Sequence, residues 1–116
     1  MAAEWVSCGS GFIEADVIRW KEGVWQKPRG RRGRTVNIGE RQVIAEVIRD
    51  AGGWVDVLVR DCTIASEKPG RKVLLLARNV EVRRKRRTIQ KGKPERLLWS
   101  DESARTILAS KFLRNR

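Results

Sequence analysis

Two runs of cationic side chains carry the chemistry that this sequence offers most plainly. The first run, KPRGRRGR, spans residues 27–34, and the second spans residues 83–96 and opens with five consecutive cations. The first run holds five cations, and the second holds eight cations and one anion, so together they account for the whole net charge of +12. Arginine dominates the first run and the opening of the second, and its guanidinium group pairs bidentately with phosphate. The two runs therefore predict a surface that binds a polyanion.

Charge concentrated in this way is typical of proteins that bind nucleic-acid phosphates. If about six to eight phosphates are neutralised, affinity for duplex DNA should fall with salt with a log–log slope of roughly −5 to −7. Such contacts supply affinity and little sequence discrimination. The cations that we expect to contact nucleic acid are Lys27, Arg29, Arg31, Arg32, Arg34, Arg83, Arg84, Lys85, Arg86, Arg87, Lys91, Lys93 and Arg96.

The first run resembles two kinds of nucleic-acid-binding peptide. Arg29-Gly30-Arg31 matches the Arg-Gly-Arg part of the AT-hook, a minor-groove peptide, although Arg32 stands where that motif has proline. The run is also similar to arginine–glycine segments that bind RNA. In both, glycine lets the arginine side chains approach a groove or a backbone closely. The resemblance to a minor-groove peptide slightly favours DNA over RNA.

Aromatic side chains supply a second kind of contact. The chain has five tryptophans, two phenylalanines and no tyrosine. Trp20, Trp25 and Trp54 lie beside predicted turns near the basic loop, where an exposed indole would stack on an unpaired base. The alternative is that each of these rings fills the core or covers one end of the sheet.

Catalytic chemistry has few residues to draw on, because the chain contains no histidine. Asp56, with Glu81 and Arg83 further on, resembles the Asp…Glu-x-Lys core of metal-dependent nucleases, with arginine in place of lysine. That resemblance implies a magnesium ion bound by the acids. Acids on half-exposed strands that pair with nearby arginines give the same pattern. We therefore expect a protein that is not an enzyme and keep the nuclease as an alternative.

Cofactor and membrane signals are absent from the sequence. Cys8 and Cys62 match no zinc spacing, so we expect no metal site, no cofactor and two free thiols. The N-terminus has no apolar segment typical of a secretory signal, and the longest apolar run, residues 73–77, is far short of a membrane span. These observations predict a cytoplasmic protein that does not bind membranes.

The elements that would hold the two runs form one domain, residues 1–116, with a β-rich body over residues 12–99. After a partly ordered lead-in, residues 12–20 alternate as a strand. Residues 21–23 then indicate a turn into a return strand at residues 24–26. This turn would bring Trp20 and Trp25 together across the two strands.

Residues 40–51 allow two interpretations. As a helix, their apolar side chains fall on one face and Gly52 ends the element. As a strand, the many β-branched residues are accommodated better, and residues 50–53 make a hairpin loop into a strand that begins at Trp54. We favour the hairpin; the helix would make the domain α+β.

The second basic run follows a predicted strand over residues 72–82, which is apolar enough to be central in the sheet. If that strand continues, its cations alternate between both faces, so residues 83–96 should project from the body as a basic arm. Leu97, Leu98 and Trp99 would then anchor the chain on the core again.

A C-terminal helix over residues 100–114 is predicted with Ser100 as its N-cap. Its apolar face, formed by Ala104, Ile107, Leu108 and Phe112, should pack on the sheet, or alternatively in a partner's groove. The fold class is mainly β: a small, curved SH3-like barrel, or an OB-like barrel, with this helix.

The function that these patterns favour is non-catalytic binding of nucleic acid, with the loop 27–34 and the arm 83–96 clamping the phosphate backbone. The alternative partner is an acidic protein, on which the same basic surface would dock in an adaptor role.

Overall fold

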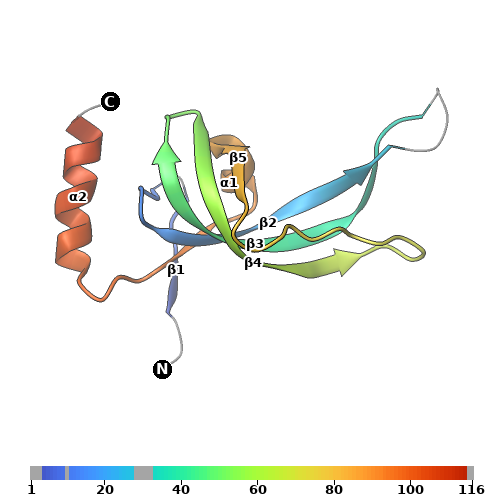
Figure 1. The fold of residues 1–116 in the computed structure, drawn as a ribbon, viewed down its shortest axis with the longest axis horizontal. Coiled ribbons are helices and arrows are strands. Elements are labelled where there is room, and N and C mark those ends of the chain that lie inside the picture. Colours follow the sequence, from blue (N-terminus) through green and yellow to red (C-terminus); the bar gives the residue numbers. More distant parts are fainter. Residues whose placement is uncertain (1–3, 10, 28–32, 115–116) are drawn as a thin grey trace.

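The computed structural model describes residues 4–9, 11–27 and 33–114, and within these ranges the chain is mainly β (Figure 1). The chain is elongated, with extents of 52 × 35 × 23 Å. In chain order, the elements are β1 (Trp5–Ser7), β2 (Val17–Gln26), β3 (Val36–Asp50), β4 (Trp54–Glu67), β5 (Glu81–Lys85), α1 (Arg86–Lys91), β6 (Glu95–Leu97) and α2 (Glu102–Arg114).

The strands form one antiparallel sheet in the order β1-β6-β2-β3-β4-β5. The sheet is open, because the outer strands β1 and β5 do not pair with each other. The mainly β prediction is confirmed, and the closed SH3-like or OB-like barrel is not formed. The segment expected as a lead-in supplies β1, which pairs with β6 from Trp5 opposite Leu97 to Ser7 opposite Glu95.

β3 and β4 are long and strongly bent. Their pairing shifts register at three places, which is the signature of bulges that curve a sheet. One half of the bent sheet folds around the core. The other half extends away from the core and is made of the end of β2, the start of β3 and the end of β4, with the connection after β4 returning along it (Figure 1). We call this half the arm; it is a different segment from the basic arm predicted at residues 83–96.

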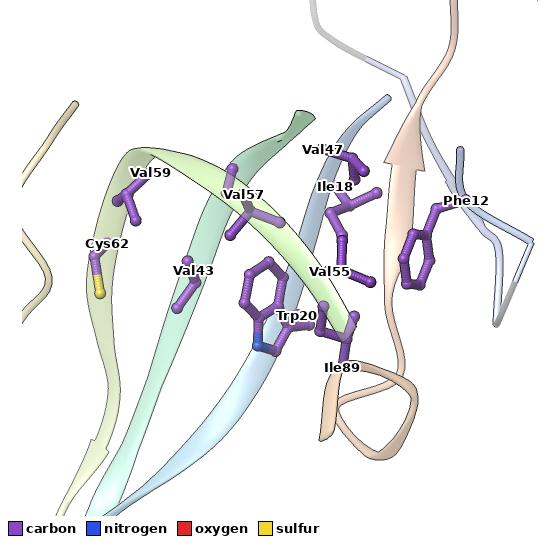
Figure 2. Close-up of a cluster of buried hydrophobic side chains, with 11 residues drawn as sticks. Phe12, Ile18, Trp20, Val43, Val47, Val55, Val57, Val59, Cys62 and Ile89 are labelled. Atoms are coloured by element: carbon purple, nitrogen blue, oxygen red, sulfur yellow. The ribbon is translucent and has the colours of Figure 1, made fainter. Parts of the chain in front are cut away.

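The core lies in the curved half of the sheet. Trp20 of β2 is 1% exposed and sits at the centre of a cluster of mostly β-branched side chains (Figure 2). The concave side is closed by Phe12 from the segment before β2 and by Ile89 from α1. Burial of these side chains contributes about 1.5–3 kcal/mol each. The other members are Ile18, Val43, Ala45, Val47, Val55, Val57, Val59 and Cys62.

The predicted turn at residues 21–23 is wrong. β2 runs unbroken from Val17 to Gln26, with Lys21 opposite Gln42 and Gly23 opposite Glu40. Pairing with β3 along this whole length overrides the local turn signal. Trp20 and Trp25 therefore lie on one strand, one buried and one exposed, and do not face each other across a hairpin.

The hairpin interpretation of residues 40–51 is confirmed. β3 continues to Asp50, and β4 starts at Trp54 after a short loop. Asp50 Oδ1 accepts a hydrogen bond of 2.9 Å from the Gly52 N–H, which fixes this turn.

The predicted strand over residues 72–82 is wrong for most of its length. Residues 71–80 have no regular strand, and β5 begins only at Glu81. Val73 is buried against Gly39 of the arm, whereas Leu74 is 70% exposed. The apolar residues of this run therefore do not form a central strand. Single side chains of the run, such as Val73, are buried against the arm.

The projecting basic arm at residues 83–96 is also not formed. Residues 81–85 complete the sheet beside β4, and the chain then turns into α1. The reason is Ile89, which is fully buried and fixes α1 on the core.

The C-terminal helix is confirmed, but its predicted N-cap and its predicted packing on the sheet are wrong; docking of the helix in a partner's groove stays a prediction. The cap is Asp101, whose Oδ1 accepts hydrogen bonds from the N–H groups of Ser103 and Ala104. α2 stands apart from the sheet, with Ile107 62% exposed (Figure 1). The side chain of Phe112 lies outside the described residues.

α2 is attached through polar contacts. Arg105 donates from Nε to Asp16 Oδ1 at 2.9 Å, and Trp99 donates from Nε1 to the same oxygen at 2.8 Å. Asp16 is fully buried, so this carboxylate depends on both donors.

Candidate nucleic-acid interface

Three of the five cations at residues 83–87 are paired with carboxylates of the protein, and two of them, Arg84 and Arg86, are largely buried. Arg83 pairs with Asp56 at 2.8 Å and Arg84 with Glu22 at 3.0 Å. Arg86 pairs with Asp50, and its guanidinium lies 4.2 Å from the centre of the Phe12 ring. Arg84 and Arg86 join elements on the core side of the sheet, whereas Arg83, opposite Asp56 in the β4–β5 pairing, lies on the other face.

Two of these carboxylates, Glu22 and Asp56, are held in their charged form. Burial alone would raise the pKa of Glu22, but hydrogen bonds from Arg84 and Arg41 outweigh it and lower the pKa below its usual range. The hydrogen bond from Arg83 lowers the pKa of Asp56, against a smaller opposing effect of burial. The pairs therefore persist at neutral pH.

The other cations of the second run separate into different places. Lys85 lies 5.3 Å from the ring centre of Trp54, beside the β3–β4 hairpin, and Arg87 is exposed. Arg96 forms two hydrogen bonds to Glu102, of 2.7 and 3.0 Å, and so belongs to the attachment of α2. Lys91 and Lys93 flank the turn after α1.

Lys91 and Lys93 meet Lys21 of β2 at this turn. Gly92 accepts a backbone hydrogen bond of 3.2 Å from the Lys21 N–H. A Cβ on Gly92 would overlap the Lys21 carbonyl oxygen, so only glycine permits this approach. Three exposed lysines therefore surround one point on the edge of β2, and among the described residues none of them forms an ion pair.

A groove runs along this edge of β2. Hollows of about 590 and 360 Å³ adjoin Lys21 and Gly92. The first reaches Trp25 and is also lined by Glu40, an exposed acid that subtracts from the positive charge. We call this surface the strand-edge groove and define it by Lys21, Trp25, Lys91, Gly92 and Lys93.

A second group of cations lies at the end of the arm. Arg71 donates to Gln26 Oε1 at 3.1 Å, and Lys68 donates from its backbone to Ile38 at 3.0 Å, so the β4–β5 connection lies beside the ends of β2 and β3. Within the described ranges none of the exposed cations there is in an ion pair. We call this group the arm tip; its members are Lys27, Arg34, Lys68, Arg71 and Lys72.

Part of the first run is not placed. Arg29, Arg31 and Arg32 lie outside the described residues. Lys27 and Arg34, which flank them, are exposed at the arm tip. Lys21, Lys68, Arg71 and Lys72 were not predicted, because they lie outside the two basic runs and only the fold brings them beside Lys27, Arg34, Lys91 and Lys93.

The three candidate tryptophans have three different environments. Trp20 is core, and its Nε1 donates to Glu22 at 3.1 Å, so no base can reach its ring. Trp54 is 46% exposed beside Lys85, away from the groove. Trp25 is 63% exposed and lines the groove.

The residues that resemble a nuclease core are engaged with arginine. Asp56 is buried and accepts hydrogen bonds of 2.8 Å from both Arg49 and Arg83. Over the described ranges, no group of three or more Cys, Asp or Glu side chains is placed to hold a metal ion.

Burial raises the pKa of the Cys8 thiol to about 11, with a smaller contribution from Asp16.

Comparisons with known proteins identify no relative. No family model matches the chain, and neither a curated protein nor a solved structure matches it. In the part of the chain that the structure describes, no helix is long and apolar enough to cross a membrane.

Proposed function

We propose that this protein is a non-catalytic nucleic-acid-binding protein whose contacts are the strand-edge groove and the arm tip. The observation that carries the proposal is the distribution of partners. Most arginines of the body, with Arg87 as an exception, are paired with carboxylates, whereas the exposed lysines of these two surfaces are not. Unpaired, hydrated ammonium groups are free to replace the counterions of a phosphate backbone.

The two surfaces are joined by β2. Lys21 lies in the groove and Lys27 follows the end of the same strand at the arm tip. At about 3.3 Å per residue they are separated by roughly 20 Å, which is the length of several nucleotides. A phosphate backbone following β2 would meet cations at both ends of this path.

The contact set differs from the one suggested by the two basic runs. Lys27, Arg34, Lys91 and Lys93 are retained in it, and Arg83, Arg84, Arg86 and Arg96 have structural partners instead. The slight preference for DNA rests on residues 27–34, whose Arg-Gly-Arg sequence suits a minor groove.

A binding titration tests the proposal directly. Labelled oligonucleotides of mixed sequence, single-stranded and duplex, are titrated with the full chain at about 0.05 M salt and then at increasing salt. We expect binding that weakens steeply as salt rises. Absence of binding to either form at the lowest salt would refute the proposal.

A further inference from the structure

Trp25 is exposed and yet held in a defined position. A Cβ built on Gly23 would lie 3.2 Å from Trp25 Nε1 and 3.0 Å from Asn37 Nδ2. Trp25 stands opposite Asn37 in the β2–β3 pairing. The indole edge therefore lies over the bare backbone at Gly23, beside the Asn37 amide, while 63% of the residue stays open to solvent.

The open side of Trp25 faces the hollow of the strand-edge groove. This hollow, of about 590 Å³, is lined by Trp25 together with Lys21, Lys91 and Gly92, and also by Glu22, Glu40 and Arg84. The indole ring and the lysines attract different parts of a ligand. The ring attracts a flat apolar surface, and the lysines attract phosphate. A nucleotide presents both groups together.

The strand edge at this point is also open. β6 pairs with β2 only at Ile18 and Arg19, and Gly92 accepts from Lys21. From Glu22 to Gln26, among the described residues, β2 has a paired strand on one side only, which is β3. An extended chain can therefore approach Trp25 along β2 without displacing a strand.

We propose, on the basis of the nucleic-acid-binding function above, that Trp25 stacks on an unpaired base and that the groove thereby selects single strands over duplex. In a duplex, each base face is covered by its neighbours, so an indole reaches one only by unstacking it. In a single strand the face is free, and stacking on an aromatic side chain is tolerant of sequence. Lys21, Lys91 and Lys93 hold the adjoining phosphates.

The test compares Trp25→Ala with Trp54→Ala as the matched control. The ligands are a labelled single strand of about 12 nucleotides and a hairpin duplex with the same number of phosphates, at about 0.1 M salt. We expect Trp25→Ala to weaken single-strand binding by about ten-fold or more and duplex binding by less than about two-fold. Trp54→Ala should change either affinity by less than about two-fold.

A second variant checks the platform itself. Gly23→Val adds atoms beneath the Trp25 ring and should displace it, reducing single-strand affinity in the same direction as Trp25→Ala. Circular dichroism and thermal melting of each variant confirm that the fold is retained. Trp25→Phe, which keeps an aromatic face, should recover most of the single-strand affinity.

The outcomes separate this inference from the function on which it rests. If the wild-type protein binds neither ligand, the proposed function fails. If it binds both and Trp25→Ala weakens both equally, or neither, the proposed function stands and base stacking is refuted. If polyglutamate of equal charge displaces the single strand as well as unlabelled oligonucleotide does, the groove recognises charge alone and the stacking inference is also refuted.

Discussion

Gly92 lies directly against the backbone of Lys21, and its carbonyl oxygen accepts a hydrogen bond of 3.2 Å from the Lys21 N–H. Because glycine has no side chain, no atom of Gly92 overlaps the Lys21 carbonyl oxygen. This contact fixes the turn between α1 and β6 on the edge of β2. It also places Lys91 and Lys93, the neighbours of Gly92, beside the Lys21 side chain. A backbone contact between residues far apart in the sequence therefore assembles the groove.

Replacing Gly92 by alanine should disturb the fold and the groove together. The added Cβ overlaps the Lys21 carbonyl, so the turn must move, at a cost of about 1–3 kcal/mol in the free energy of unfolding. Urea denaturation measures this cost. Gly53→Ala is the control: no atom lies within 4 Å of its Cβ position, and stability should change by less than about 0.5 kcal/mol. Equal stability of the two variants would contradict the close approach.

Arg84→Ala should destabilise the protein, although Arg84 belongs to a run that resembles a binding surface. Its removal leaves the buried Glu22 with Arg41 as its remaining guanidinium partner. The expected loss is about 1–3 kcal/mol, measured by urea denaturation. Arg87→Ala, which removes an exposed neighbour, should cost less than about 0.5 kcal/mol. If Arg84→Ala unfolds no more easily than Arg87→Ala, the cluster has no structural role.

Acid should destabilise the protein through its paired carboxylates. Hydrogen bonds from Arg96, and then from the Trp99 backbone, lower the pKa of Glu102 to about 2, and the pKa values of Glu22 and Asp56 are also lowered. A carboxyl whose pKa is lower in the folded state stabilises that state above its unfolded pKa of about 4. This contribution is lost as the pH falls through the folded pKa.

The melting temperature should therefore decrease as the pH falls from about 5 to about 2. Glu102→Gln should lower it at neutral pH and flatten its dependence over that acid range, since this carboxyl no longer titrates. The measurement is thermal melting followed by circular dichroism at several pH values. An unchanged acid slope in Glu102→Gln would show that the carboxyl of Glu102 is not coupled to folding.

Glu40→Gln should strengthen binding to nucleic acid. Glu40 is exposed and lines the same hollow as Lys21 and Lys91, so its charge repels a phosphate there. Removing it should raise affinity by about two- to five-fold, and the gain should shrink as salt screens the charges. Oligonucleotide titration at two salt concentrations measures both effects. A loss of affinity would place the ligand elsewhere.

The sequence predicts the strands that pair locally better than the strands that pair at a distance. The β3–β4 hairpin follows from its β-branched residues and the glycines between them. The apolar run at residues 72–82 misleads, because Val73 is buried by Gly39 across the arm while its neighbour Leu74 is exposed. Only the tertiary fold decides which side chain of such a run is covered.

The candidate site is harder to predict than the fold. Arg83 and Asp56 are 27 residues apart, and Arg84 and Glu22 are 62 apart, so no local pattern reveals that these arginines are neutralised. Lys21 is likewise a single cation in an ordinary strand. The proposed class of partner rests on net charge, whereas the proposed binding surface rests on which cations the fold leaves unpaired.

The most direct test of the account is the salt dependence of nucleic-acid binding in two variants that lose the same charge. K21Q/K91Q/K93Q removes the lysines of the strand-edge groove. R60Q/R78Q/K85Q removes three cations from other parts of the described surface, two of them paired with Glu46 and Asp61. Both variants reduce the net charge equally.

We predict that the groove variant loses about ten-fold or more in affinity for a single strand, and that its log–log salt slope becomes less steep by about 2. The control variant should stay within about two-fold of the wild-type affinity at about 0.1 M salt, where distant charges are screened. Equal losses in the two variants would contradict the account, because net charge and not the strand-edge groove would then determine binding.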